Sequence, residues 1–198
     1  MGFHRRSVRA SVVAALFAIS VAIPAAAANA KADLSRIHID NFGMVSTTYY
    51  RGAQPKGRDY ADLAALGVKA VIDLTDDDSD SSEPAMVKDA GMKSFRIPMS
   101  TRKEPTRDQL AQFLKIVNDP ANQPVYVHCV GGRHRTGVMT AVYRMTGEGW
   151  SSEKAFAEMK QYKYGADFLH PEFKSFVYAF KPEPKGSVPT VVALTTQP

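Results

Sequence analysis

The 198-residue sequence contains a single cysteine, Cys129, so no internal disulfide can form. A disulfide-stapled scaffold is therefore excluded, and stability has to come from a hydrophobic core. The length is sufficient for one domain with one sizeable core. A lone thiol acts either as a small buried hydrophobe or as a reactive group, and its solitude does not decide between the two.

Long apolar runs are lacking as well. The run Val12–Ile23 is interrupted only by Ser20, but at about 12 residues it is shorter than the ~20 that span a bilayer. Basic residues precede this run, and Ala28-Asn29-Ala30 follows it as a small-x-small cleavage site. The pattern predicts a signal peptide over residues 1–30 and an exported protein, periplasmic or secreted. We expect no stable membrane span once the signal is removed.

A strong excess of one charge is also missing. The formal net charge is +5, and three arginines lie within residues 1–30, which leaves +2 for the mature chain. The totals therefore do not indicate a nucleic-acid partner, and any cationic site must be local. The sequence does not indicate an oligomeric state.

A helix–glycine–strand pattern occurs twice in the first half of the mature chain. A helix over 58–66 stops at Gly67 before a buried strand over 68–74, and a helix over 84–90 stops at Gly91 before a strand over 92–97. This alternation predicts an α/β fold, with one domain over residues 31–181. We expect a central, mostly parallel sheet of four to five strands flanked by helices, followed by a disordered tail over 182–198.

The remaining elements follow from caps and apolar periodicity. We expect a strand over 37–50 interrupted near 41–43, a turn over 51–55, an acidic loop over 76–82, a helix starting at the Thr106–Gln109 capping box and ending at Asp119-Pro120, a strand over 125–127, a helix from Thr136 to Gly147, a helix from the Ser151 cap to Lys160, and a helix from Pro171.

The decapeptide HCVGGRHRTG, residues 128–137, joins a buried strand to a helix through a glycine-rich turn. Backbone N–H groups of such a loop point inward, and the helix N-terminus adds partial positive charge, so the geometry suits a phosphate. Gly131 and Gly132 allow backbone angles that other residues resist. Arg135 can donate two parallel hydrogen bonds to phosphate oxygens.

Cys129 lies at the base of this cradle, where a positive field favours the thiolate form of a cysteine. A thiolate beneath a bound phosphate is a nucleophile directed at phosphorus. Attack would form a phosphocysteine that water then hydrolyses, with the loop amides and Arg135 holding the equatorial oxygens. The hydroxyl of Thr136 is close enough in sequence to hydrogen-bond the sulfur.

This sequence resembles the cysteine-dependent (protein tyrosine and dual-specificity) phosphatase superfamily, whose signature is His-Cys-x5-Arg-(Ser/Thr). It is most similar to the atypical dual-specificity phosphatases of plants and fungi and their bacterial relatives. Those commonly carry Gly-Lys-His-Arg-Thr-Gly, where this chain has Arg133 in place of lysine. The similarity extends through Tyr50–Pro55, the turn at Gly67 and Val71–Leu74, and covers roughly residues 45–180.

The resemblance implies the roles of the motif residues. Cys129 is the nucleophile, Arg135 the phosphate clamp and Thr136 the partner of the thiolate. His128 either orients the site or is an ordinary core histidine. No metal or other cofactor is expected. Substrate-binding amides are assigned to Val130, Gly131, Gly132, Arg133 and His134.

The general acid is not evident. Relatives usually place an aspartate before the helix that precedes the signature strand, to protonate the leaving oxygen. The corresponding loop, residues 98–105, has Glu104 as its only carboxylate, and Asp108 follows in the first turn of the helix. Three possibilities stay open: Glu104, Asp108, or no acid, as a phosphoanhydride with its stable leaving group would permit.

The substrate is a phosphorylated protein, a phosphorylated small molecule or a lipid headgroup. The resemblance also permits an inositol pyrophosphate, although export argues against an intracellular metabolite. Arg102, Lys103, Arg107 and Arg133 either surround the cleft or are ordinary surface charges. Arg51 is a candidate for packing against the active-site loop. The acidic run at 76–80 lacks the glycine and distal glutamate of an EF-hand and is expected to be solvated.

Two other functions remain open. A rhodanese-like sulfurtransferase also places a cysteine in an anion-binding loop before a helix, although its loop is usually shorter. A phosphate-binding module that has lost catalysis would fit the missing aspartate. The leading hypothesis is an exported phosphatase that acts on phosphotyrosine, phosphoserine/threonine or phosphoinositide esters.

Overall fold

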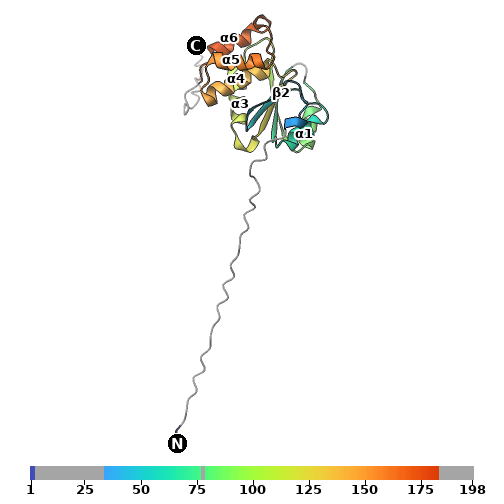
Figure 1. The fold of residues 1–198 in the computed structure, drawn as a ribbon, viewed down its shortest axis with the longest axis vertical. Coiled ribbons are helices and arrows are strands. Elements are labelled where there is room, and N and C mark those ends of the chain that lie inside the picture. Colours follow the sequence, from blue (N-terminus) through green and yellow to red (C-terminus); the bar gives the residue numbers. More distant parts are fainter. Residues whose placement is uncertain (3–33, 77–78, 183–198) are drawn as a thin grey trace, which may run out of the picture. The chain divides into compact units, whose positions relative to one another are not determined.

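Five strands form one sheet in the order β1-β2-β5-β3-β4 (Figure 1). In this computed structural model, which describes residues 1–2, 34–76 and 79–182, the strands are β1 Gly43–Ser46, β2 Tyr49–Ala53, β3 Ala70–Thr75, β4 Lys93–Met99 and β5 Val125–Cys129. Only β1 runs antiparallel to its neighbour. The expected α/β fold with a mostly parallel sheet is confirmed. The predicted signal peptide and nearly all of the predicted tail lie outside the described residues.

Six α-helices connect and cover the strands. They are α1 Asp59–Ala65, α2 Glu83–Asp89, α3 Arg107–Val117, α4 Arg135–Glu148, α5 Ser152–Gln161 and α6 Pro171–Ala179, with short 3-10 turns at Leu34–Arg36, Pro120–Asn122 and Asp167–Leu169. The capping box at α3 is confirmed, because Thr106 accepts from the backbone of Gln109 and the Gln109 side chain accepts from the backbone of Thr106. Ser151 likewise caps α5.

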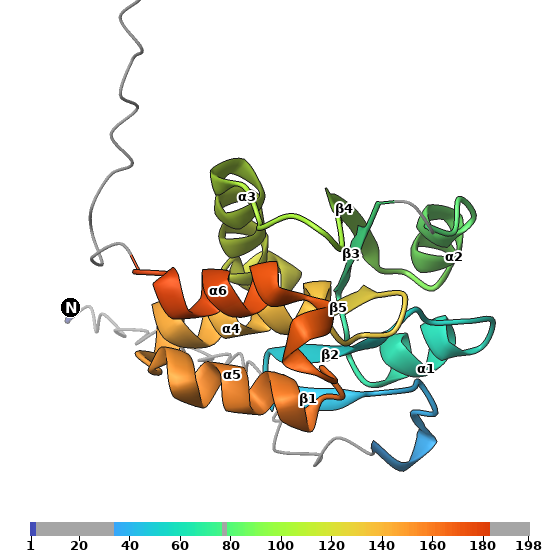
Figure 2. The same cartoon turned by 90° about the horizontal axis from the view of Figure 1, so that it is seen from above.

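The helices lie in two layers. Helices α1 and α2 pack on one face of the sheet, and α3, α4, α5 and α6 lie on the other (Figure 2). Side chains of a strand alternate between the two faces. On β5, Val125, Val127 and Cys129 join the larger core under α3–α6, whereas Tyr126 joins the core under α1 and α2.

The winding direction reverses at β5. The chain proceeds outward from β2 through α1 to β3 and through α2 to β4, and then returns through α3 to β5, between β2 and β3. Such a reversal opens a crevice at the carboxyl ends of the strands, where ligands bind in open α/β sheets. Cys129 is the last residue of β5, so the fold places it at this point.

The N-terminal prediction was wrong in detail. Residues 37–50 do not form one interrupted strand, and 51–53 are not part of a turn. Instead β1 and β2 form a short hairpin, and β2 continues through Ala53 because every one of its residues is buried and pairs with β5. The end of α4 also differs. Gly147 is helical, and the helix ends at Gly149, which adopts the left-handed conformation with φ 69°.

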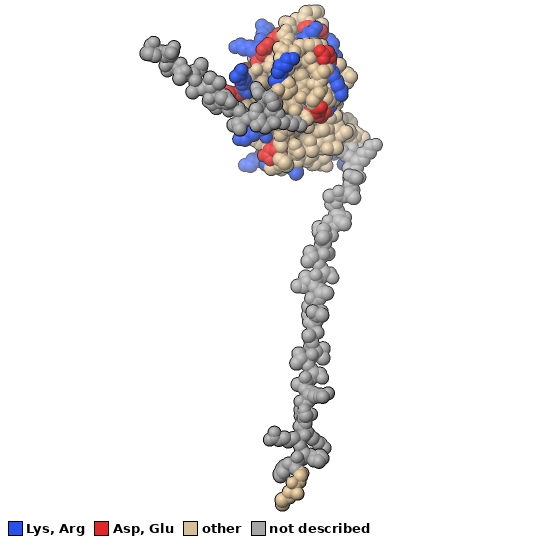
Figure 3. All heavy atoms as spheres, turned by 90° about the vertical axis from the view of Figure 1, so that its left-hand side faces the viewer, with Lys and Arg blue, Asp and Glu red and all other residues tan. Residues whose placement is uncertain are grey.

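Among the described residues, none of the helices has both the length and the apolar character needed to cross a bilayer. On the face drawn in Figure 3, basic and acidic side chains are interspersed over the surface.

Candidate active site

The sequence motif forms a strand, a loop and a helix at the carboxyl edge of the sheet. β5 ends at Cys129, the loop covers residues 130–134, and α4 begins at Arg135. On β2, Ala53 is in register with Cys129, and on β3, Asp73 is in register with His128. The cysteine is therefore held between two parallel neighbours, and its side chain is only 3% exposed.

A pocket of about 340 Å³ opens above Cys129. It is lined by Thr101, Cys129, Val130, Gly131, Arg133, His134 and Arg135. Six of these seven residues belong to the predicted site, so the structure brings most of that site together. The pocket is of a size that accommodates a phosphate group together with part of the molecule that carries it.

Arg135 lies in the first turn of α4 and is almost completely buried. Its Nη1 donates to the backbone oxygen of Met99 at 3.1 Å. Met99 is the last residue of β4, so this hydrogen bond ties the guanidinium to the strand edge from which loop 98–105 departs. The bond restricts the side chain of Arg135, which also lines the pocket.

Thr136, the next residue, is completely buried and does not line the pocket. Within the described part of the chain its hydroxyl has no hydrogen-bond partner. A buried hydroxyl normally has a partner, and its absence calls for an explanation. The predicted hydrogen bond to the Cys129 sulfur is therefore not formed in this structure, and a role for Thr136 in the reaction stays a prediction.

The loop 130–134 packs directly against the backbone of β2 at Gly132. Gly132 has φ 62°, and a Cβ atom there would lie 2.2 Å from the carbonyl carbon of Gly52. Only glycine fits such a contact. By contrast, Gly131 lies outside the positive-φ region, so the expectation of special backbone angles holds for Gly132 and not for Gly131.

Two side chains hold the carbonyl oxygen of Gly132. Asn41 donates from Nδ2 and Arg51 from Nη2, both at 2.8 Å. In a planar trans peptide the C=O and the following N–H point in opposite directions. The N–H of Arg133 therefore points away from Asn41 and Arg51. The suggestion that Arg51 packs against the loop is confirmed, whereas no local sequence signal pointed to Asn41.

His134 faces the helical side of the loop. Its Nε2 contacts the backbone oxygen of Tyr164 at 2.9 Å, and its ring lies 3.8 Å from that of His170, between centroids. Burial, and then the charge of His170, lower the pKa of His134. His170 Nδ1 in turn lies 3.0 Å from the oxygen of Thr101. His170, which sequence reasoning missed, thus links the loop 130–134 to the loop 98–105.

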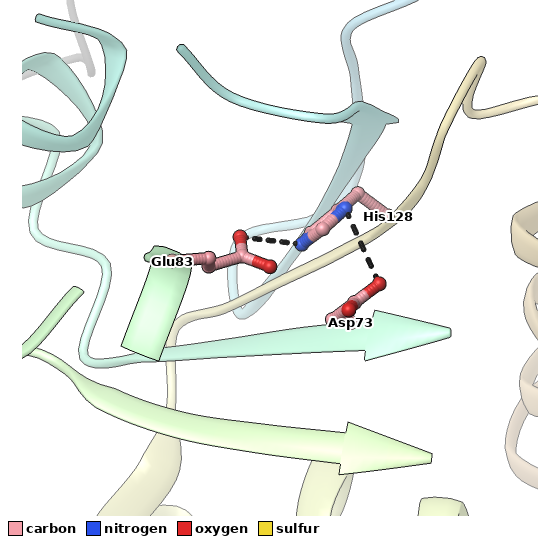
Figure 4. Close-up of side chains that lie close together, drawn as sticks. All are labelled: Asp73, Glu83 and His128. Carbon is pink, nitrogen blue, oxygen red and sulfur yellow. Dashed lines mark ion pairs between the residues drawn. The ribbon is translucent and has the colours of Figure 1, made fainter. Parts of the chain in front are cut away.

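His128 directly precedes Cys129 on β5, so the two side chains point to opposite faces of the sheet. Figure 4 shows the His128 ring between Glu83 and Asp73. Its Nε2 lies 2.9 Å from Oε1 of Glu83, and its Nδ1 lies 3.9 Å from Oδ1 of Asp73. All three side chains are buried. Burial raises the pKa of Glu83, but the hydrogen bond and charge of His128 outweigh it and hold that pKa below its usual value. His128 is thus a buried histidine between two carboxylates, and an orienting role in the reaction stays a prediction.

These three residue types are common metal ligands, and their polar atoms lie within 4.8 Å of one another. The carboxylates, however, already accept hydrogen bonds from protein donors. Asp73 accepts from the backbone of Thr75 at 2.7 Å, and Glu83 accepts from the hydroxyl of Tyr60 at 3.2 Å. We interpret the cluster as an internal ion-pair network that supports β5 directly behind Cys129.

The candidate acids are both exposed. Glu104 and Asp108 lie at the surface, and neither lines the pocket. The loop 98–105 reaches the pocket only through Thr101, which carries no ionisable group. The basic residues Arg102 and Lys103 beside it are exposed. The identity of the acid therefore stays a prediction.

A cysteine at the end of a central parallel strand, a loop that contacts β2 at Gly132 and an arginine in the first turn of the next helix together define a cysteine-dependent phosphatase of the dual-specificity class. The family comparison gives the same assignment. A family model described as "DSP-PTPase phosphatase fused to NAD+ Kinase" matches residues 32–175. The chain belongs to this family.

Individual relatives agree with the family. The chain is 30% identical over 126 residues to the probable tyrosine-protein phosphatase DG1060 of Dictyostelium discoideum, covering 62% of this chain and 75% of that protein. It is 30% identical over 130 residues to the inositol diphosphatase SIW14 of Saccharomyces cerevisiae, covering 63% of this chain but only 46% of the yeast protein. The crystal structure of TpbA from Pseudomonas aeruginosa aligns with a TM-score of 0.62 and 25% identity, covering 72% of this chain and 86% of that one.

Proposed function

We propose that this chain is an exported phosphomonoesterase that works through a covalent phosphocysteine. The single observation that carries the proposal is that Cys129 forms the base of a pocket whose other walls include the loop 130–134 and Arg135. These groups combine a nucleophile with donors suited to the three equatorial oxygens of a phosphoryl group in transfer.

In the first step the thiolate of Cys129 attacks phosphorus. An S–P bond forms as the P–O bond to the leaving group breaks, and the leaving oxygen keeps the electron pair and takes a proton. The loop amides and the guanidinium of Arg135 stabilise the charge on the transferring group. Glu104 is our candidate for the proton donor, because it is the only carboxylate in the loop that contributes Thr101 to the pocket.

In the second step a water molecule attacks phosphorus, the S–P bond breaks, and inorganic phosphate leaves. The sulfur departs as a thiolate, and a hydrogen bond from Thr136 would stabilise it. This role gives the buried hydroxyl of Thr136, which lacks a partner among the described residues, a function.

Phosphotyrosine is the first substrate class to test. Its phenolic oxygen is a better leaving group than an alkoxide and so demands less of an acid. A relative with 26% identity, TpbA, has been solved in complex with phosphotyrosine. A polyphosphorylated inositol is the second class, because Arg133 lines the pocket with its side chain 46% exposed and the yeast relative is an inositol diphosphatase.

The test uses the full chain beside Cys129→Ser. Phosphate release from p-nitrophenyl phosphate and a phosphotyrosine peptide should be abolished in the serine variant. Acid quenching during turnover should leave one phosphoryl group on the peptide that contains Cys129, detected by mass spectrometry. Residual turnover in the serine variant would refute the covalent route. Thiocyanate formed from thiosulfate and cyanide would instead support sulfur transfer. Binding of the phosphate ester without turnover would support a phosphate-binding module that has lost catalysis.

Export is tested separately. Expression of the full chain in a bacterial host should yield a processed protein outside the cytoplasm whose N-terminus is Lys31, the residue after Ala30. Replacing both Ala28 and Ala30 by leucine removes the small side chains of the cleavage site and should block processing. An intact N-terminus in a cytoplasmic product of the unmodified chain would overturn this part of the proposal.

A further inference from the structure

Arg51 is a buried cation with unfilled hydrogen-bonding capacity. The residue is 0% exposed, and Nη2 donates to the backbone oxygen of Gly132 at 2.8 Å, which uses one of the five N–H donors of the guanidinium. Nε and Nη1 are buried and lack a hydrogen-bond partner in the described part of the chain. No carboxylate of the described residues pairs with it within ion-pair distance.

A guanidinium in this setting is unusual, because buried charges in proteins are normally paired. Burial lowers the pKa of Arg51, but arginine keeps its proton throughout the range in which proteins are folded. The ring of Tyr162 lies 4.0 Å from its guanidinium carbon and supplies a cation–π contact. That contact offsets only part of the missing solvation, so an anion nearby would be stabilised.

The fold brings the Cys129 sulfur to that location. In the ladder between β2 and β5, Arg51 is in register with Val127, and Ala53 with Cys129. Because side chains alternate along a strand, Arg51 and Tyr49 share a face of the sheet, as do Val127 and Cys129. Tyr49, Val127 and Cys129 all belong to the core under α3–α6. Arg51 and Cys129 are therefore diagonal neighbours on one face, with their Cα atoms about 8 Å apart from strand spacing and rise.

We propose that Arg51 is a positioning residue for the phosphatase reaction, which holds the loop 130–134 through the Gly132 carbonyl and stabilises the Cys129 thiolate with its charge. The inference rests on the proposed phosphocysteine mechanism for its catalytic meaning. Its electrostatic part, however, concerns the resting enzyme and can be measured without any substrate.

Asn41 provides a matched control. It donates to the same Gly132 oxygen at the same distance of 2.8 Å, but it carries no charge. Its φ is 56°, so glycine can replace it without backbone strain. Asn41→Gly therefore removes the hydrogen bonds from Nδ2 to Gly132 at 2.8 Å, to Gly131 at 3.5 Å and to the backbone of Tyr162 at 2.9 Å, and leaves the charge of Arg51. Arg51→Gln removes the charge and keeps an amide donor. Arg51→Lys keeps the charge and loses the planar fork.

The experiment measures the rate at which iodoacetamide alkylates the full-length protein as a function of pH. Cys129 is the only cysteine, so the rate reports on this residue alone. In Arg51→Gln the midpoint of the profile should move upward by about one pH unit, as expected for unit charges ~8–10 Å apart at an effective dielectric of about 20. The midpoint of Asn41→Gly should stay at the wild-type value, and that of Arg51→Lys should move by less than half as much as that of Arg51→Gln.

Phosphatase assays complete the test. Both Arg51→Gln and Asn41→Gly should lose kcat through a looser loop, but only the former should shift its pH profile. An unshifted midpoint in Arg51→Gln, or an equal shift in Asn41→Gly, would overturn the proposal. Should Arg51→Gln melt below the assay temperature, Arg51→Met serves as the second neutral variant, because apolar side chains of similar volume often replace buried charges without loss of stability. Failure of the proposed function is a separate result, namely phosphate release by Cys129→Ser.

Discussion

Replacing Gly132 by alanine tests the hypothesis that close backbone contact with β2 sets the conformation of the phosphate-binding loop. The residue has φ 62°, and an alanine Cβ would lie 2.2 Å from the carbonyl carbon of Gly52, 2.3 Å from its oxygen and 2.6 Å from the nitrogen of Ala53. All three are backbone atoms of a strand that is paired on both sides. The strand cannot yield, so the loop has to move.

The size of the effect follows from this geometry. Real Cβ atoms essentially never approach a neighbour closer than 3.0 Å, so the closest contact alone requires a shift of 0.8 Å. Displacements of about 1 Å in a catalytic site can cost ~10²-fold in rate. The left-handed backbone adds a penalty of about 1–2 kcal/mol for a residue with a Cβ. We expect kcat on p-nitrophenyl phosphate to fall by about 100-fold and unfolding free energy by at least ~1–2 kcal/mol.

Gly131→Ala is the control within the same loop. Its Cβ would come no closer than 3.4 Å, to Nε of the half-exposed Arg133 side chain, which can move aside. Its loss in kcat should therefore be at least ten times smaller, although it lines the pocket. Steady-state kinetics and urea unfolding of both variants give the comparison. Equal activities in the two alanine variants would refute the claim that contact with β2 sets the loop geometry.

Three further predictions concern stability and proton transfer. Arg144→Ala leaves Glu158, its partner at 2.7 Å, unpaired and should lower the unfolding free energy by about 2–3 kcal/mol in urea titration, with kcat of the folded enzyme unchanged. Glu83→Gln removes a carboxylate whose pKa is held low by His128 despite burial. Such a group contributes stability above its unfolded pKa, and this contribution is lost as the pH falls through the folded pKa. The unfolding free energy that the variant lacks at pH 7 should therefore shrink on acidification below about pH 4. Glu104→Gln should slow hydrolysis of an alkyl phosphate and spare an aryl phosphate, since only the poorer leaving group needs the acid.

Each of these predictions has a contradicting result. Unchanged stability of Arg144→Ala would mean that the attraction between Arg144 and Glu158 only offsets the cost of removing the two charges from water. A deficit of Glu83→Gln that persists or grows in acid would contradict the direction of its pKa. Equal rates of Glu104→Gln on both classes of ester would remove Glu104 from the acid role.

The core of the site could be predicted because it is local in sequence. Cys129 and Arg135 are separated by five residues, and the strand, the loop and the helix that carry them are contiguous. The cap of α3 at Thr106 is local for the same reason, because its partner is three residues away. Patterns of a few residues can be recognised in the sequence without knowledge of the tertiary fold.

The long-range contacts that hold the loops of the site could not be predicted in the same way. Asn41 and Gly132 are separated by 91 residues, and His170 and Thr101 by 69. Such contacts depend on the order of strands in the sheet, which no local pattern encodes. The error at Arg51–Ala53 has the same origin: a Gly and a nearby Pro are typical of a turn, but pairing with β5 and complete burial extend β2 through these residues.

We expect the substrate preference to depend on how the loop 98–105 meets the pocket. Thr101 is held there through its backbone oxygen by His170, while the only carboxylate of the loop, Glu104, is exposed outside the lining. Because Glu104 lies outside this lining, it is less favourably placed to protonate a leaving oxygen in the pocket. An ester whose leaving group is stable without a proton avoids this requirement altogether. On chemical grounds we therefore expect the pocket to discriminate by leaving group, in favour of aryl phosphates and phosphoanhydrides over alkyl phosphates.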